Sequence, residues 1–405
     1  MRIGIAIIIF VLLSLPFLTG EGENVMIDGN KLFVGGSGPG NYSKIQDAIN
    51  HARSGDIIFV YAGIYKENIE IYHMRDLTII GENMENTIID GDFNSDDVVS
   101  IYYSHGIKIA NFTIRNSGQS YYYCGLEASS SEYCEISNCQ FENDFHGIIV
   151  YKSSHNKIIN CIFNDLQGQS ILITINSNYN EIKNCQFKYA NWTGTYIYRS
   201  KENRIMNSNF YDCDIAITIY SSSNCQLEGV AVSSCGSTDS ISLFVGKSQN
   251  ITLQNCNISK SKNTGLAISQ SSNILVSDSS FVNDVAGIIL YGVYDSQIEN
   301  CTVSGSTYSG ISIEYSSHNI VRYCTIKENK ACGIYLFETE NDVINYNNII
   351  NNGWGMFVNH SIVDARYNYW GSVFGPLTFG LFGDGIWWTK GSKVIFFPWA
   401  FMEIK

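Results

Sequence analysis

The segment CEISNCQFENDFHGIIVYKSSHNKIINCIF (residues 134–163) contains one strand pattern twice, centred on Ile136 and Ile158. The same pattern recurs at intervals of 22 to 27 residues. Its central position is occupied by Ile109, Ile136, Ile158, Ile182, Ile205, Leu227, Leu253, Val276, Ile298, Val321 and Ile344. A repeat this short, with brief strands and no helical periodicity, predicts an all-β solenoid, the right-handed parallel β-helix.

Stacking of successive coils explains most positions of the repeat. Two residues after the central position, Asn, Gly or Asp predominates, and these residues tolerate the left-handed backbone of a sharp turn. Cys follows in six coils, and two residues beyond it lies an apolar column that includes Phe141, Phe163, Phe187, Phe210 and Phe281. A Ser column precedes the central position by five residues, where hydroxyls can bond turn backbone groups. We expect these columns to be structural.

The two ends of the repeat array differ from the coils between them. YSKIQDAINHARSGD (residues 42–56) predicts a short amphipathic capping helix, with Ser43 as its candidate N-cap and Gly55 as its end. The expected organisation is a signal peptide, an N-terminal cap with the first coils, the repeat coils and a C-terminal capping segment. Their bounds are 1–22, 24–96, 97–360 and 361–405.

The N-terminus and the charge predict an exported protein. Met1 and Arg2 precede an apolar stretch (3–18) and then small residues, the pattern of a signal peptide, with an uncleaved anchor as the alternative. The stretch is shorter than the ~20 residues of a spanning helix. The net charge is −13 without any run of Lys or Arg, which argues against binding to nucleic acid or anionic lipid. We expect an extracellular or cell-surface location.

Two segments resemble a known group of proteins. IQDAINHARSGDIIFVYAGIYKENI (45–69) and LTIIGENMENTIIDG (77–91) resemble the N-terminal cap of pectin-lyase-like β-helix proteins, above all the NosD-like and carbohydrate-binding and sugar-hydrolysis families. NYWGSVFGP (368–376) resembles their closing segment. The resemblance covers residues 27–400 and implies the fold. It leaves activity open, because this fold carries lyases, hydrolases, epimerases, esterases and non-enzymes.

An outward column of aromatic residues is not explained by stacking. We expect coils ~4.8 Å apart, so the column would span several sugar rings. Aromatic rings pack on the apolar faces of pyranoses, and Tyr hydroxyls add polar contacts. The sequence therefore predicts binding of polysaccharide or glycoprotein glycans. The alternatives are the strand preference of Tyr or a protein partner that covers the face. The predicted binding residues are Tyr102, Tyr151, Tyr198, Tyr220, Tyr291, Tyr335 and Phe337, with Tyr196 and Phe244 beside them.

Catalysis is the second hypothesis for this face. Hydrolysis of a glycosidic bond needs two carboxyl groups ~5–9.5 Å apart. Glu314 and Glu338, in adjacent coils, are the candidates, whereas Glu127 stands alone. The Gln/Asp/Asp/Arg set of the pectin methylesterases has no counterpart here. A polysaccharide lyase or hydrolase is thus the alternative to a binding protein, and enzymatic activity stays an open question.

The sequence suggests one metal ion, and no cofactor is required. Asp90, Asp92, Asn94 and Asp96 alternate as D-x-D-x-N-x-D, the spacing of a calcium loop, although Ser95 replaces the expected Gly. NosD proteins assist copper-site assembly, so a NosD-like accessory role is a further alternative. The seven His and seven Met residues form no cluster, which disfavours copper.

The twelve Cys residues have two interpretations. Six occupy the inward column, where Cys behaves as a small apolar residue. Cys213 and Cys235 occupy equivalent positions of neighbouring coils and are the best disulfide candidate for an exported protein.

Overall fold

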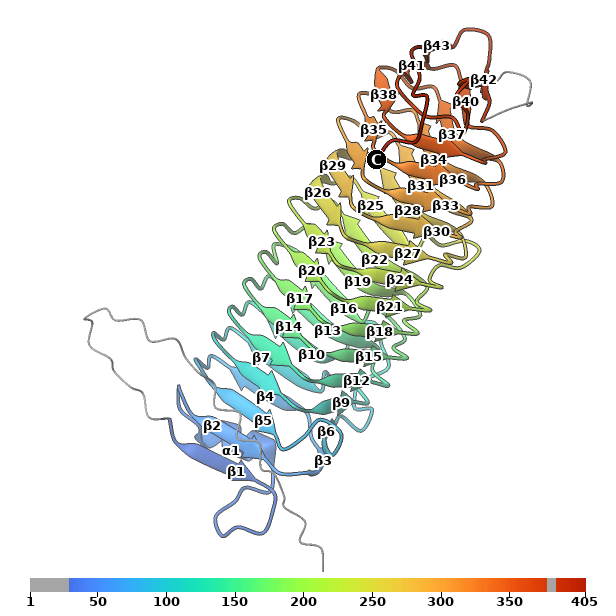
Figure 1. Cartoon of the computed structure of the whole chain (residues 1–405). Coiled ribbons are helices and arrows are strands. Elements are labelled where there is room, and N and C mark those ends of the chain that lie inside the picture. Colours follow the sequence, from blue (N-terminus) through green and yellow to red (C-terminus); the bar gives the residue numbers. More distant parts are fainter. Residues whose placement is uncertain (1–28, 377–383) are drawn as a thin grey trace, which may run out of the picture.

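The computed structural model describes residues 29–376 and 384–405, so the predicted signal peptide (1–22) lies outside the described residues. The chain winds into one long stack of coils, with the N-terminal strands at one end and the C-terminal strands at the other (Figure 1). Each coil adds strands to three parallel sheets of 16, 13 and 14 strands, here named sheets A, B and C. The predicted all-β solenoid is confirmed.

Sheet A contains the central positions of the repeat. These residues pair from coil to coil in one register, from Ile109 with Ile136 to Val321 with Ile344. The repeat read from the sequence is therefore the coil of the solenoid. The strands of sheet A are β1 (Lys31–Val34), β2 (Ile57–Val60), β5 (Thr78–Gly81), β8 (Lys108–Ala110), β11 (Glu135–Ser137), β14 (Lys157–Ile159), β17 (Glu181–Lys183), β20 (Arg204–Met206), β23 (Gln226–Glu228), β26 (Gln249–Gln254), β29 (Ser272–Ser277), β32 (Gln297–Glu299), β35 (Ile320–Arg322), β38 (Asp342–Asn345), β41 (Ile362–Asp364) and β43 (Lys393–Ile395).

Sheet B carries the inward Phe column. The rings of Phe163 and Phe187 are 4.9 Å apart and those of Phe187 and Phe210 are 4.3 Å apart, nearly parallel in both pairs. The strands of sheet B are β3 (Gly63–Lys66), β6 (Thr87–Asp90), β9 (Thr113–Arg115), β12 (Gln140–Glu142), β15 (Ile162–Asn164), β18 (Gln186–Lys188), β21 (Asn209–Tyr211), β24 (Ala231–Ser233), β27 (Asn257–Ser259), β30 (Ser280–Val282), β33 (Thr302–Ser304), β36 (Thr325–Lys327) and β39 (Asn348–Ile350).

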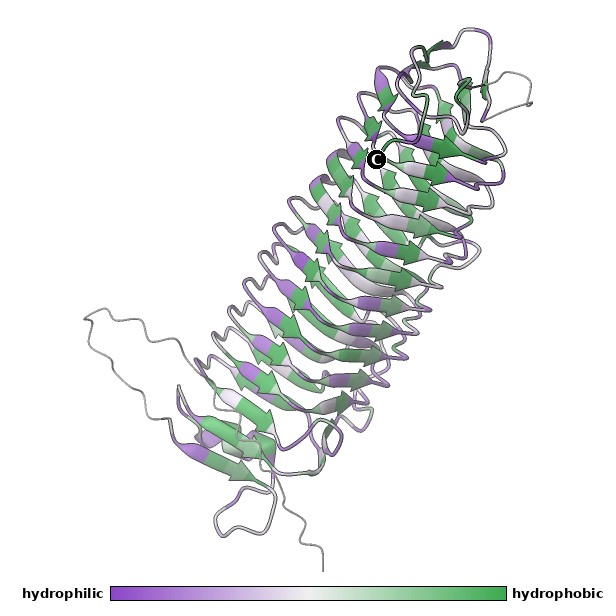
Figure 2. Cartoon of the chain, in the orientation of Figure 1, coloured by the Kyte–Doolittle hydropathy of each residue, from purple (hydrophilic) through white to green (hydrophobic). Residues whose placement is uncertain are grey.

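Sheet C is built from the Gly-Ile-x-Val strands, and its outer surface carries the aromatic column. Hydrophobic residues alternate with more polar ones along the strands of the solenoid (Figure 2). The strands of sheet C are β4 (Ile69–Tyr72), β7 (Val99–Tyr102), β10 (Cys124–Ser129), β13 (His146–Tyr151), β16 (Ile171–Thr174), β19 (Thr193–Tyr198), β22 (Ile215–Tyr220), β25 (Leu243–Gly246), β28 (Thr264–Ser269), β31 (Ala286–Tyr291), β34 (Ser309–Glu314), β37 (Cys332–Phe337), β40 (Met356–Asn359) and β42 (Ile386–Trp388).

Polar ladders hold the turns between the sheets. Asn138, Asn160 and Asn184 have positive φ, and each side-chain amide donates to the Asn of the preceding coil at 3.2–3.4 Å. In the Ser column, the backbone N–H of Ser131 donates to the hydroxyl of Ser153 at 2.9 Å, and the pattern continues along the stack. The turn and Ser columns therefore have the structural role predicted for them.

The N-terminal helix α1 (Ile45–His51) packs Ile45, Ala48 and Ile49 into the core, as predicted. Its cap differs from the prediction. Ser43 is not the N-cap, because the first residue before the helix is Lys44, which makes no side-chain capping bond. The carboxylate of Glu67 instead accepts the N–H groups of Ile45 and Gln46, at 2.8 and 3.0 Å. The described residues 29–376 and 384–405 contain no helix long and apolar enough to span a membrane.

Candidate functional site

The strand register places the predicted aromatic residues on two columns of sheet C. Tyr102, Tyr151, Tyr198, Tyr220, Tyr291 and Phe337 occupy one column, and Tyr335 lies in the second. Tyr72 extends the first column by one coil, because it pairs with Tyr102. Neighbouring rings approach each other: Tyr198 and Tyr220 are stacked at a centroid distance of 6.2 Å.

Sequence reasoning pointed to Tyr196, Phe244 and Tyr335 in the second outward column, but it missed that this column is apolar for most of its length. Tyr196 and Phe244 lie in it, at the x position of the Gly-Ile-x-Val pattern. The signal was present, since large apolar residues recur at a position that faces away from the core. Together the two columns form the aromatic face, which is half-buried to exposed for most of its length. The other large apolar residues of the second column are Ile149, Leu172, Ile289, Phe357 and Trp387.

A pair of carboxyl groups lies at the N-terminal end of the aromatic face. Glu127, which is isolated in the sequence, lies beside Asp97, and burial together with Glu127 raises the pKa of Asp97 to about 7. The hydroxyl of Tyr102 donates to Glu127 Oε2 at 3.0 Å. Asp97 Oδ1 accepts the backbone N–H of Cys124 at 2.7 Å. A carboxyl group whose pKa lies near neutrality can donate or accept a proton, as acid–base catalysts do.

The candidate catalytic residues Glu314 and Glu338 lie at the other end of the face. Glu314 belongs to the first aromatic column, next to Tyr291, and accepts a hydrogen bond from the Ser312 hydroxyl at 2.7 Å. Glu338 follows β37 in a turn with φ of 49°. A surface hollow there is lined by Tyr315, Ser316, Ser317, Glu338, Glu340 and His360, without Glu314. The hollow therefore does not bring the two predicted carboxylates together.

Two family models match the chain. The model described as "Right handed beta helix region" matches residues 215–387, and the model "Periplasmic copper-binding protein (NosD)" matches residues 49–228. The chain is a right-handed parallel β-helix protein with a NosD-like region. No curated protein matches its sequence.

Solved structures similar to this β-helix protein include carbohydrate-active enzymes. The A-module of a mannuronan C-5 epimerase from Azotobacter vinelandii is 14% identical, with a TM-score of 0.57 over 86% of this chain and 94% of that one. The catalytic domain of a GH87 α-1,3-glucanase in complex with tetrasaccharides is 13% identical, with a TM-score of 0.56 over 94% and 71%. Pre-mature gene product 12 of bacteriophage phi29 is 14% identical, with a TM-score of 0.67 over 87% and 55%. These similarities establish the fold.

The described part of this β-helix protein offers no fitting donor set for the copper named by the NosD family model. Copper prefers clustered imidazole and sulfur ligands. Residues 29–376 and 384–405 contain no group of three or more His, Cys, Asp and Glu side chains arranged to hold a metal. His146, the one His in a sheet C strand, is committed to the backbone: its ring nitrogens contact Tyr121 O at 3.1 Å and Gln169 N at 2.9 Å.

The predicted calcium loop is held by protein contacts instead of converging on one point. Asp90 is buried, and burial alone would raise the pKa of its carboxyl. Hydrogen bonds from the Asn116 amide, the Asp92 N–H and Arg115 Nε, the last at 2.9 Å, lower it instead. Asp92 pairs with Lys66 Nζ at 2.8 Å. The amide of Asn94 and the carboxylate of Asp96 form separate hydrogen bonds, to Asn68 and to the N–H of Asp97. Calcium binding stays a prediction for this segment.

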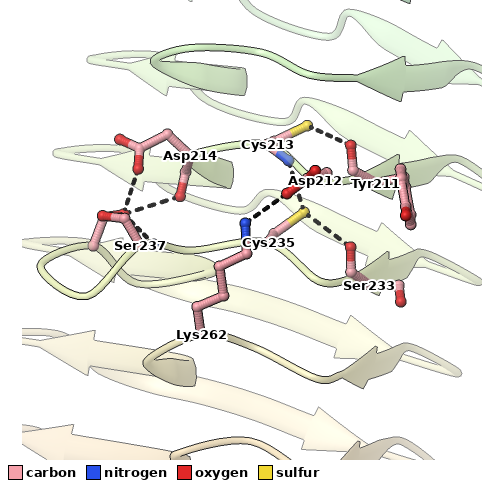
Figure 3. Close-up of polar contacts among 9 residues, drawn as sticks. Tyr211, Asp212, Cys213, Asp214, Ser233, Cys235, Ser237 and Lys262 are labelled. Atoms are coloured by element: carbon pink, nitrogen blue, oxygen red, sulfur yellow. Dashed lines mark hydrogen bonds and ion pairs between the residues drawn. The ribbon is translucent and has the colours of Figure 1, made fainter.

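The expected disulfide between Cys213 and Cys235 is absent, and all twelve Cys residues are free and buried. Figure 3 shows the two thiols stacked in neighbouring coils, where Cys213 N–H donates to Cys235 Sγ at 3.3 Å. Each thiol also points toward the carbonyl two residues before it. Side chains at the same position of stacked coils point the same way, so they pack in parallel instead of turning toward each other.

We expect all twelve thiols to be unreactive in the folded protein. All twelve thiols are buried, so a reagent in solution cannot reach them while the coils stay stacked. Ellman's reagent should therefore detect no fast-reacting thiol in native protein purified without reductant. The same sample in denaturant should give twelve thiols per chain. A count of ten in denaturant would show that one disulfide forms after all.

Proposed function

We propose that this protein is an exported polysaccharide-binding β-helix, which holds a glycan chain along the aromatic face of sheet C. The observation that carries the proposal is the register of the first column, in which Tyr198 pairs with Tyr220 and other rings recur on the same line. Consecutive coils are ~4.8 Å apart, close to the length of one pyranose residue in an extended chain. The rings therefore form a series of stacking platforms along one direction.

The chemistry of the face suits sugars better than a flat protein partner. Tyr combines an apolar ring with a hydroxyl, as does a pyranose with its CH face and its hydroxyls. The similar epimerase and glucanase structures are named for polysaccharide substrates, and one of them holds tetrasaccharides. The family model names a periplasmic protein, which is consistent with the signal-peptide pattern at residues 1–22. The competing hypothesis is that a protein partner covers the aromatic face.

The direct test is a glycan array with purified protein and a Tyr151→Ala/Tyr220→Ala variant. Losing two stacking platforms should weaken binding roughly 10- to 100-fold, about 1–3 kcal/mol. The matched control is Tyr189→Ala/Tyr211→Ala, which removes two exposed, contacting Tyr rings near sheet B. The control should bind as the wild type does. Undiminished binding by the first variant would overturn the proposal.

The carboxyl pair at Asp97 and Glu127 favours a second candidate, a polysaccharide lyase or hydrolase. Glu127 lies in the second column of the aromatic face with the buried Asp97 beside it, and the pKa of Asp97 of about 7 suits proton transfer at neutral pH. The same glycans, incubated with the protein, distinguish the two candidates. New reducing ends or unsaturated products would establish catalysis, and binding without products supports the non-catalytic role.

A further inference from the structure

Acidic and basic residues are separated along the aromatic face. Seven consecutive strands of sheet C, from β13 to β31, contain no Asp or Glu, although the chain carries a net charge of −13. The acidic residues of the sheet C strands lie outside this tract, at Glu70 in β4, Glu127 in β10 and Glu314 in β34. Six spacings of ~4.8 Å give the tract a length of about 29 Å.

Three cations border the acid-free tract in one register. Lys152, Arg199 and Lys247 each follow the last residue of a sheet C strand, and all three have φ of 48–49°. The coils between them carry Ile175 and Ser221 at the same position. A cation therefore recurs at every second coil, about 10 Å apart.

The cations are oriented over the aromatic face. Lys152 Nζ lies 5.0 Å from the centroid of the Tyr151 ring, the Arg199 guanidinium lies 5.0 Å from Tyr198, and Lys247 Nζ lies 5.5 Å from Tyr220. A cation over a ring keeps its charge available to a third group. Each cation thus lies next to a stacking platform.

None of these three cations forms an ion pair within residues 29–376 and 384–405. Lys262 provides the contrast, because its Nζ is bound to Asp212 at 2.6 Å in the turns that lead from sheet B to sheet C (Figure 3). Most Lys and Arg side chains in the described part of the chain also lack an ion-pair partner, so these three are distinguished by their common position over the aromatic face. Three unpaired cations in one row are therefore available to an external anion.

We propose that the glycan is an anionic polysaccharide with one carboxylate or sulfate per disaccharide. Its acid groups bind Lys152, Arg199 and Lys247, while its sugar rings stack on the neighbouring Tyr151, Tyr198 and Tyr220. The inference rests on the proposed function and names its substrate class. A disaccharide repeat of an extended chain spans two coils, which is the spacing of the cations. Glu127 and Glu314 limit the binding tract at its two ends, because their negative charges repel an anionic polymer.

The test uses a hyaluronan octasaccharide, which carries one carboxylate per disaccharide, and its carboxyl methyl ester, which is neutral and otherwise alike. The variant is Lys152→Gln/Arg199→Gln/Lys247→Gln. Gln is compatible with this backbone, since Gln270 occupies the same turn position with φ of 48°. The control is Lys157→Gln/Lys183→Gln/Arg204→Gln, which removes the same three charges from sheet A. Circular dichroism and the Tm verify that all variants fold.

The wild type should bind the acid form roughly 10- to 100-fold more tightly than the ester, and salt should weaken this preference. The sheet C variant should lose the preference, and the sheet A control should keep it. Equal binding of acid and ester by the wild type would overturn the inference. If a neutral glycan still binds and the Tyr151→Ala/Tyr220→Ala variant loses it, the proposed function stands without the charge inference. If the sheet A control loses as much of the preference for the acid form as the sheet C variant does, the net charge of the protein explains the effect and the inference fails.

Discussion

Asp284→Asn is expected to stabilise the protein by about 2–4 kcal/mol at pH 8 and by little at pH 4.5. The Asp284 side chain is 1% exposed, and its Oδ2 has no hydrogen-bond partner. Burial raises the pKa of this carboxyl from 3.8 to about 7. Three pKa units correspond to about 4 kcal/mol, which sets the upper limit.

The sign of the pH dependence follows from which state holds the proton more tightly. The folded protein keeps Asp284 protonated up to about pH 7, whereas the unfolded chain releases this proton near its ordinary pKa of 3.8. The contribution of the protonated Asp284 to the free energy of unfolding is therefore fully present below pH ~4. It is lost as the pH rises from ~4 through ~7. Asp384, with a pKa raised by burial to about 6, acts in the same direction.

An amide suits the position because the chain already uses it in equivalent coils. Asn329 occupies the same column, and its amide donates to the carbonyl of Val303 at 3.3 Å while its Oδ1 accepts the N–H of Ser306 at 3.0 Å. Asp284 Oδ1 accepts the N–H of Ser261 at 2.8 Å in the same way. Asn at 284 can keep this bond without a buried ionisable group.

Thermal unfolding at pH 4.5 and 8 measures the effect, with Asp295→Asn as the control. Asp295 is exposed in a turn with φ of 53°, a conformation that Asn adopts readily, so this control makes the same charge change at the surface. Asp295→Asn should leave the Tm nearly unchanged at both pH values. A Tm for Asp284→Asn that does not rise at pH 8, or rises equally at pH 4.5, would contradict the assignment.

Phe187→Ala is expected to destabilise the solenoid by about 3–5 kcal/mol. Phe187 is fully buried between the parallel rings of Phe163 and Phe210. Its removal leaves a cavity between the rings of Phe163 and Phe210. This cavity cannot close, because the backbone coils fix the positions of both rings. Coils of a solenoid depend on their neighbours, so the loss should lower the cooperativity of unfolding as well as the Tm.

Lys188→Ala is the matched control for Phe187→Ala. Lys188 is the next residue of β18 and is exposed on the outer side. A surface substitution there should change stability by about 0.5 kcal/mol or less. Urea unfolding of both variants gives the comparison, and similar losses for the two would contradict the packing account.

The repeat was predictable because each coil imposes the same requirements on its residues. An inward Ile, a turn residue with positive φ and an inward Phe must return once per coil, so Ile136, Asn138 and Phe141 have counterparts along the chain. The resemblance of residues 45–69 and 77–91 to known caps made the N-terminal cap predictable as well. These signals are local in sequence or strictly periodic, and both kinds can be read without coordinates.

The parts that were missed depend on contacts between distant residues. Glu67 caps helix α1 from 22 residues away, and no local motif such as Ser43 reveals it. Asp97 lies beside Glu127 because β7 pairs with β10 and places Ser100 opposite Glu127, although Asp97 and Glu127 are 30 positions apart in the sequence. The row of Lys152, Arg199 and Lys247 was hidden because alternate coils carry Ile or Ser.

Oxidative footprinting of Tyr residues in the presence of an acidic oligosaccharide is the most direct test of the central claim, that the aromatic face of sheet C binds the glycan. With the hyaluronan octasaccharide bound, oxidation of Tyr151, Tyr198 and Tyr220 should decrease several-fold. Tyr323 and Tyr346, which stack on each other beyond sheet A, should be oxidised as before. Binding that protects Tyr323 and Tyr346 but leaves the sheet C tyrosines unprotected would contradict the account.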